Sequence, residues 1–238
     1  MTSEVADAEL WDLRNLAGAR RYCDWIFEQF EDEVGGSVAE VGAGIGTFSD
    51  RILARGVERL LLVEPEAACM EVLSDRYAGD PRVELAAEEV PGSQALEAPP
   101  GRFDFIICQN VLEHIPDHAG ALRALAAALR PGGRLGLLVP ANPRLFGPLD
   151  AAYGHERRYE AASLRRLVGE AGFEVEALYP FNLPGVPAWW LRSRLGGSGV
   201  GGRSVRLYEG VVRLWRPVER RWRPPAGLSL IVRARVPA

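Results

Sequence analysis

Short apolar runs alternate along the chain with longer segments in which apolar residues recur every three or four positions. The uninterrupted runs are typical of strands covered on both faces, and the longer periodic segments are typical of helices. The expected strands are 38–42, 60–64, 82–86, 103–108, 134–139, 173–179 and 228–236. The expected helices are 9–34 with a break at Gly18, 47–55, 66–77, 117–130 and 160–171, with 91–101 as a loop. This alternation predicts an α/β fold with a doubly wound, largely parallel sheet of seven strands.

Three glycines at alternate positions, Gly42, Gly44 and Gly46, join the first expected strand to the following helix. Glycine permits positive φ and a close approach of a ligand, and a helix N-terminus presents free N–H groups. The dinucleotide fingerprint G-x-G-x-x-G would need a third glycine where Thr47 stands, so the spacing disfavours a nicotinamide dinucleotide. An acidic residue, Glu40, lies inside the strand two positions before the first glycine.

Ligands of doubly wound sheets bind outside the carboxyl ends of the strands. The segments expected at that edge are 42–46, Glu64, 86–89, 108–111 and 139–142. A carboxylate such as Glu64, which closes the second strand, is suited to bind both hydroxyls of a ribose. A solvated acid at a strand end is the alternative interpretation.

Three motifs resemble one enzyme family. The pattern E-x-G-x-G-x-G over 40–46 resembles motif I of the class I S-adenosylmethionine (SAM)-dependent methyltransferases. The stretch FDFIICQNVLEHIPD at 103–117 and the turn LRPGGRLG at 129–136 resemble segments of the UbiE/UbiG-like branch (methyltransferase type 11/12/23). The resemblance covers residues 38–140 and implies a Rossmann-like fold with a final antiparallel strand. It also implies SAM as cofactor and S-adenosylhomocysteine as product.

The resemblance and the chemistry of the residues together predict a set of cofactor-binding residues. These are Glu40, Gly42, Ala43, Gly44, Gly46, Glu64, Pro65, Glu88, Gln109, Asn110 and Tyr22. Backbone N–H groups of the glycine loop suit the carboxylate of SAM, and Glu40 suits its ammonium. Glu88, or its neighbour Glu89, is expected at the adenine amino group. The aromatic rings of Tyr22 and Trp25 are candidates to cover the cation, with ordinary helix packing as the alternative.

Candidate chemistry for the acceptor lies after the fifth expected strand. The segment HERRY at 155–159 resembles an H-x-R-R-Y/F segment found there in relatives. His155 is the candidate general base, since imidazole titrates near neutral pH, and His114 is a weaker candidate. Arg157 and Arg158 are suited to an acidic group or phosphate on the substrate, although the whole segment can equally pin its loop. The expected substrate contacts are Arg158, Tyr159, Asn142 and Trp189. No metal is expected, because Cys and His are few and dispersed.

The C-terminal part of the chain differs in charge from the rest. Residues 192–238 hold 11 Arg and 2 acidic residues, whereas the whole chain has a net charge of −4 and contains no Lys. We expect an N-terminal helical segment at 1–36, a SAM-binding core at 37–180 and 228–238, and an Arg/Trp-rich helical insertion at 181–227. Within the insertion, 193–204 is glycine-rich and expected to be flexible.

An apolar stripe recurs at helical spacing within 205–222, and Pro217 is expected to kink or end that helix. The members of the stripe are Leu207, Val211, Trp215, Val218 and Trp222. Three interpretations stay open: a cap over an apolar substrate pocket whose mouth is 182–190, a homodimer interface, or contact with an anionic membrane surface.

The sequence therefore predicts a SAM-dependent methyltransferase that methylates a small or lipophilic acceptor, at a hydroxyl oxygen. N-methylation of a small amine is the alternative. Rivals from other classes are a nicotinamide-dependent oxidoreductase and a catalytically silent partner with the SAM fold. Nucleic acid is not expected as a partner, because the net charge is negative and no N/D-P-P-Y/F segment follows the fourth strand. Scattered cysteines and an acidic N-terminus predict a cytoplasmic protein, peripherally membrane-associated if 205–222 contacts lipid.

Overall fold

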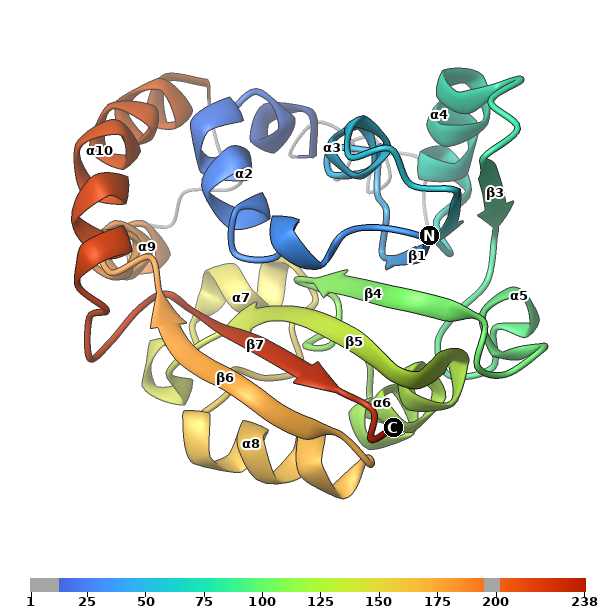
Figure 1. Cartoon of the computed structure of the whole chain (residues 1–238). Coiled ribbons are helices and arrows are strands. Elements are labelled where there is room, and N and C mark those ends of the chain that lie inside the picture. The colour runs from blue at the N-terminus through green and yellow to red at the C-terminus, as the bar shows by residue number, and fades with distance from the viewer. Residues whose placement is uncertain (1–12, 195–201) are drawn as a thin grey trace.

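A seven-stranded sheet forms the centre of the molecule (Figure 1). The computed structural model describes residues 13–194 and 202–238. The strand order is β3-β2-β1-β4-β5-β7-β6, and β7 runs antiparallel to both of its neighbours while the other pairs are parallel. The strands are β1 Ser37–Val41, β2 Arg59–Val63, β3 Val83–Ala86, β4 Phe103–Gln109, β5 Leu129–Pro140, β6 Glu174–Phe181 and β7 Ser229–Arg235. The predicted Rossmann-like sheet with a final antiparallel strand is confirmed.

Helices cover both faces of this sheet (Figure 1). They are α2 Arg20–Phe27, α3 Ser49–Ala54, α4 Ala67–Tyr77, α5 Gln94–Glu97, α6 His118–Ala128, α7 Pro148–Ala152, α8 Ala161–Glu170, α9 Gly185–Arg194 and α10 Gly202–Arg221. Short 3-10 helices span Glu31–Glu33 and Pro143–Leu145. The helices α2, α3 and α4 lie on one face and α6 and α8 on the other, while α10 packs outside α2 at one end of the molecule (Figure 1).

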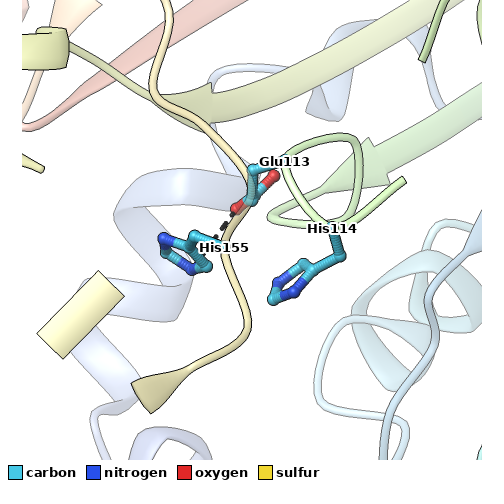
Figure 2. A group of neighbouring side chains, drawn as sticks. All are labelled: Glu113, His114 and His155. Carbon is cyan, nitrogen blue, oxygen red and sulfur yellow. Dashed lines mark ion pairs between the residues drawn. The ribbon is translucent and has the colours of Figure 1, made fainter. Parts of the chain in front are cut away.

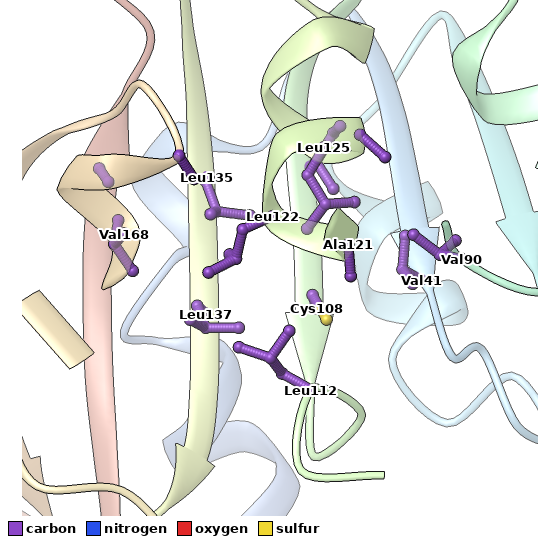
Figure 3. Packing of buried hydrophobic residues seen from close by; sticks show 14 of the residues in the cluster. Val41, Val90, Cys108, Leu112, Ala121, Leu122, Leu125, Leu135, Leu137 and Val168 are labelled. Atoms are coloured by element: carbon purple, nitrogen blue, oxygen red, sulfur yellow. The ribbon is translucent and has the colours of Figure 1, made fainter. Parts of the chain in front are cut away.

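The alternation of side chains along each strand divides the core between the two faces. In β4, Phe105 and Ile107 join the cluster under α2 and α3, whereas Ile106 and Cys108 join the cluster under α6 and α8. Figure 3 shows part of the second cluster, in which Leu122 of α6 lies among side chains of the neighbouring strands. Both faces of the central strands are therefore dry, which explains their unbroken apolar runs.

The N-terminal helical region is more broken than the sequence predicts. A helix at 13–17 ends at Gly18, whose N–H donates to the carbonyl of Arg14 at 3.1 Å, and α2 then stops at Phe27. The break at Gly18 was expected, whereas the end of the long helix at 34 was wrong. Residues 9–12 of that expected helix lie outside the described residues.

Three other boundaries differ from expectation. The expected loop at 91–101 contains the short helix α5, because the hydroxyl of buried Ser93 accepts the N–H of Leu96 and caps its first turn. Strand β5 begins at Leu129 and includes the PGG turn, five residues earlier than expected. Pro217 does not end α10, which continues to Arg221. The expected flexible stretch at 193–204 lies largely outside the described residues.

Candidate active site

The carboxyl ends of the parallel strands meet at one edge of the sheet. Val41 at the end of β1 pairs with Val63 of β2 and with Cys108 of β4, and Gln109 pairs with Leu138 of β5. The segments that follow these strands therefore share one edge, as the sequence predicts. This edge is where a doubly wound sheet binds its ligand.

The glycine turn after β1 requires its glycines. Gly42, Gly44 and Gly46 have φ values of +75°, +54° and +82°. A Cβ atom on Gly42 would lie 2.1 Å from Cγ2 of Val111, and one on Gly46 would lie 2.6 Å from the hydroxyl of Tyr77. The bare backbone of the turn therefore packs against the segment that follows β4 at Gly42 and against the end of α4 at Gly46, which only glycine allows.

Glu64 connects this turn to the end of β2. Its Oε2 atom accepts the N–H of Gly44 at 2.8 Å, and its Oε1 atom accepts the N–H of Glu66 at 3.0 Å. Pro65, exposed beside it, leads into α4. A buried carboxylate between the glycine turn and the start of a helix occupies the position from which ribose hydroxyls are bound in folds of this kind.

Glu40 is a second buried carboxyl group at the same edge. It is only 4% exposed and accepts the hydroxyl of Ser49 at 2.5 Å. Burial, with a smaller contribution from Glu64, raises the pKa of Glu40 to about 8. A cation bound beside Glu40 would favour its ionised form, so this group is suited to an ammonium.

Gln109 supplies an unpaired amide at this edge. Its Nε2 and Oε1 atoms are both buried and have no hydrogen-bond partner within the described chain. Native proteins pair almost all buried polar atoms, so this amide is suited to a polar ligand. Asn110 follows it in a left-handed conformation, with φ +53°, and is exposed. Amide groups, glycine N–H groups and the carboxyl groups of Glu40 and Glu64 together match the carboxylate, ammonium and ribose of SAM, so the residues present fit this cofactor.

Two other predicted cofactor contacts have structural partners. Glu88 accepts the hydroxyl of Ser93 at 2.6 Å and the N–H of Ala95 at 3.0 Å, and these bonds lower its pKa. The hydroxyl of Tyr22 accepts a hydrogen bond from Asn182 at 3.4 Å, and burial raises its pKa to about 12. The binding roles of Glu88 and Tyr22 therefore stay predictions.

Trp25 lies away from the surface. Only 1% of it is exposed, and its ring centroid lies 4.4 Å from that of Phe181. Of the two alternatives given for Trp25, ordinary helix packing is the one that its burial in the core supports.

The loop between β5 and α8 closes at its base. Ala141 and Tyr159 form a bridge in which the N–H of Asn142 donates to the carbonyl of Tyr159 and the N–H of Tyr159 donates to the carbonyl of Pro140, both at 2.9 Å. The hydroxyl of Tyr159 donates to the carbonyl of Leu112 at 3.1 Å. These bonds hold the loop against the LEH turn that follows β4.

Asp150, in α7, organises the polar groups of this loop. Its Oδ1 atom accepts hydrogen bonds from Nδ1 of His155 at 2.8 Å and from Nε of Arg158 at 2.7 Å. Its Oδ2 atom accepts the N–H of Gly147 at 3.0 Å and Nε1–H of Trp189 at 3.3 Å. Burial alone would raise the pKa of Asp150, but the bonds from His155 and the charge of Arg158 outweigh it and lower the pKa. The group is therefore ionised at neutral pH.

The bond to Asp150 determines the tautomer of His155. An ionised carboxylate only accepts hydrogen bonds, so Nδ1 carries the proton and Nε2 of the neutral ring has a free lone pair. Nε2 lies 4.0 Å from Oε1 of Glu113. The ring of Trp189 lies parallel to the imidazole, with 6.4 Å between centroids and 2° between planes. The geometry thus gives His155 the form of a general base.

Glu113 and His114 complete the surroundings of His155 (Figure 2). Glu113 is fully buried, and neither carboxyl oxygen has a hydrogen-bond partner in the described chain. Burial raises the pKa of Glu113 to about 8, against the opposing charge of Arg158. His114 meets His155 edge-on at 4.9 Å, and burial together with His155 lowers the pKa of His114.

Two imidazoles and a carboxylate form a donor set that transition metals accept. One potential ligand atom from each of Glu113, His114 and His155 lies within 4.8 Å of the other two. That no metal takes part stays a prediction. Asp150 and Glu113 were not expected as site residues. Glu113 lies in the same motif as His114, whereas Asp150 lies five residues before His155, outside the HERRY segment.

The predicted substrate residues divide into two groups. Arg158 and Tyr159 are about 6% and 5% exposed and hold the loop from inside; Arg158 donates to the carbonyl of Ala141 at 3.1 Å and lies over the ring of Trp189. Asn142 is exposed, with φ +61°, and caps the 3-10 helix that follows it. Trp189 is half-buried beside His155. The contacts of these four residues with a substrate stay predictions. The hydrogen bonds of Arg158 and Tyr159 hold the loop in place.

Comparison with known proteins identifies the family. A family model described as a methyltransferase domain matches residues 14–178. The chain is 32% identical over 137 residues to the ubiquinone biosynthesis O-methyltransferase of Pseudomonas paraeruginosa (strain DSM 24068 / PA7), a match that covers 55% of this chain and 56% of that protein. The chain spans about half the length of the curated relatives it matches.

Solved structures share the fold. A SAM-dependent methyltransferase from Mesorhizobium loti has a TM-score of 0.60 at 16% identity, covering 85% of this chain and 92% of that chain. An N-methyltransferase of Haemonchus contortus, solved with phosphomonomethylethanolamine and S-adenosylhomocysteine, has a TM-score of 0.59 at 16% identity, covering 93% of this chain and 57% of that chain. With the family match over most of the chain, the chain belongs to the class I SAM-dependent methyltransferase family.

Proposed function

We propose that this protein transfers the methyl group of SAM to a hydroxyl oxygen of a small or lipophilic acceptor. The observation that carries the proposal is the hydrogen bond between ionised Asp150 and Nδ1 of His155, which leaves Nε2 free to accept a proton. A neutral hydroxyl is a weak nucleophile, and proton removal by a positioned base increases its reactivity. The name of the matched relatives, O-methyltransferase, supports oxygen as the acceptor atom.

In this mechanism the protein mainly positions the two reactants and removes the proton from the acceptor hydroxyl. SAM supplies an electrophilic methyl group on a sulfonium when it is bound by the glycine turn, Glu40, Glu64 and Gln109. His155 accepts the hydroxyl proton on Nε2, and the resulting imidazolium is stabilised by the carboxylate of Asp150. Trp189 flanks the imidazole and helps to exclude water from the site. Exclusion of water favours direct displacement at the methyl carbon.

The helical insertion contributes to this site through α9. Trp189 of α9 donates to Asp150 and stacks on His155, so residues 185–194 border the proposed acceptor site. We propose that α9 is a wall of the acceptor site, in keeping with the predicted cap. The apolar aromatic surface there supports a lipophilic acceptor over a highly charged one.

The proposal is tested by mass spectrometry with purified protein, SAM and a panel of paired acceptors that differ only in bearing a hydroxyl or an amine. The expected result is methylation of a hydroxyl, which His155→Gln lowers by about 10²-fold or more while SAM affinity stays unchanged. Methylation of amines alone, insensitive to His155→Gln, would assign N-methylation instead. A loss confined to His114→Gln would make His114 the base.

The same assay run with a chelator tests the metal. Activity is expected to persist, because a metal ion on Nε2 of His155 would block the lone pair that takes the proton. Activity lost with the chelator and restored by a divalent ion would assign Glu113, His114 and His155 to a metal site.

A further inference from the structure

Helix α10 has two different apolar faces. One faces the core, where Val212 is fully buried and Tyr208 and Trp215 pack against the cluster beneath α2. The other faces outward and is 37–76% exposed at each position. Its members are Leu207, Val211, Leu214, Val218 and Trp222. These five, here called the outer stripe, recur at intervals of three and four residues and so share one side of the helix. The predicted stripe was wrong at Trp215, which faces inward, while Leu214 takes the outward position.

Both acidic residues of α10 point toward the protein. Glu209 accepts the N–H groups of Arg21 and Tyr22 at the start of α2, each at 3.0 Å. Glu219 accepts the N–H of Asn182 at 2.7 Å and Nε1–H of Trp215 at 2.7 Å. The exposed surface of the helix therefore carries no carboxylate among the described residues of α10.

Arginines without acidic partners lie beside the outer stripe. Arg206, Arg213 and Arg221 are exposed, and none of them pairs with a carboxylate in the described part of the chain. At 100° per residue Arg221 falls at the edge of the stripe, whereas Arg206 and Arg213 fall roughly 80–100° from Leu214, between the stripe and the face that packs on α2. Arg216 and Arg220, by contrast, pair with Glu28. The outward side of α10 thus combines apolar side chains with positive charge alone.

We propose that the outer stripe and its flanking arginines bind the surface of an anionic lipid bilayer, with α10 lying flat on it. An amphipathic helix with Trp and Leu on one side and arginine beside them suits the headgroup boundary, where each arginine is attracted to the anionic surface. In a contact with a second copy of the chain, arginines of one α10 would face arginines of the other and repel them. Charge therefore favours an anionic lipid surface as the partner. In residues 13–194 and 202–238 no helix is long and apolar enough to cross a bilayer, so the contact is peripheral.

This inference extends the proposed function, but vesicle binding can be measured independently of methyl transfer. Binding at a bilayer surface would bring the acceptor site, bordered by α9, close to lipophilic acceptors that partition into lipid. Helix α9 also exposes Trp190 and Leu191, about 46% and 52% accessible, with the guanidinium of Arg194 over the Trp190 ring. Trp190 and Leu191 directly follow Trp189 along α9.

The test is co-sedimentation with vesicles of phosphatidylcholine alone and of phosphatidylcholine mixed equally with phosphatidylglycerol. We expect binding to the anionic vesicles that weakens as salt rises and is absent on phosphatidylcholine alone. The double variant Arg206→Glu/Arg213→Glu is expected to bind at least about tenfold more weakly, and Leu207→Glu/Leu214→Glu likewise. The matched control Arg165→Glu/Arg166→Glu, which reverses two exposed arginines of α8, is expected to bind as the unmodified protein does.

Sedimentation velocity and SAM calorimetry accompany this test. Absence of binding to anionic vesicles, or an equal loss in the α8 control, would overturn the proposal. A dimer that Leu207→Glu/Leu214→Glu dissociates, without vesicle binding by the unmodified protein, would assign the stripe to a second copy. A variant that binds SAM normally but no longer binds vesicles shows that membrane binding and the proposed catalytic function are separable.

Discussion

Nδ1 of His155 lies 2.8 Å from Oδ1 of Asp150, and Arg158 donates to that same oxygen from 2.7 Å. The two donors keep the carboxylate ionised, and the carboxylate in turn keeps the Nδ1 proton on the imidazole. A base is thereby oriented by a group that need not touch the acceptor. Asp150 is thus a positioning residue, and its contribution is separable from that of His155.

Asp150→Asn should lower kcat by about 10²-fold or more, because an amide cannot stabilise the imidazolium that forms on proton transfer. The affinity for SAM, measured by calorimetry, is expected to stay unchanged. A pH profile distinguishes this role from a structural one: without the neighbouring negative charge the imidazolium is less favoured, so an amide in place of the carboxylate shifts the profile toward lower pH. An unchanged profile in a folded variant would remove Asp150 from the mechanism.

SAM binding at neutral pH should release a proton. The pKa of Glu40 is raised to about 8, so the group is largely protonated at pH 7, whereas a bound ammonium requires its ionised form. Titration calorimetry in buffers of different ionisation enthalpy measures this release. Glu40→Gln should abolish it and weaken SAM, and a release that persists in Glu40→Gln would exclude Glu40 as the ammonium partner.

Raised carboxyl pKa values make stability depend on pH in one direction. Glu113 has a pKa of about 8 in the folded protein against 4.5 as an ordinary value, so the folded state binds the extra proton between these values. The free energy of unfolding should therefore fall as pH rises from about 4.5 to 8, because the folded state keeps this proton and the unfolded state loses it. Denaturant titrations of Glu113→Gln should show a shallower fall than the unmodified protein. Parallel curves would contradict the assignment.

The glycine turn offers a matched pair of substitutions. Gly42→Ala and Gly79→Ala place the same side chain at φ +75° and +81°, but only the first meets an atom, Cγ2 of Val111 at 2.1 Å. Backbone strain should lower the free energy of unfolding of both variants by about 1–3 kcal/mol. Gly42→Ala should be destabilised more than Gly79→Ala and should bind SAM more weakly. Thermal melts and SAM titrations of both variants measure the difference. Equal losses in both, with full SAM affinity, would show that the turn does not cradle the cofactor.

The sheet and the cofactor edge were predictable because they depend on local patterns. Unbroken apolar strands, glycines at alternate positions and an acid at the end of β2 each follow from neighbours in sequence. The partner of His155 was not predictable from the sequence. Asp150 lies in a segment without hydrophobic periodicity, and it meets His155 only once the loop folds back on Tyr159. The orientation of α10 was missed at Trp215 because both of its faces are apolar. Only the contact with α2 shows which face is covered.

Titration calorimetry of the purified protein with SAM and, separately, with NADH tests the central claim most directly. We expect saturable binding of one SAM per chain, weakened by Glu64→Ala, and no heat of binding with NADH. Binding of NADH without SAM would contradict the account and favour an oxidoreductase. Binding of SAM without turnover on any hydroxyl or amine of the panel would favour a catalytically silent protein with the SAM fold.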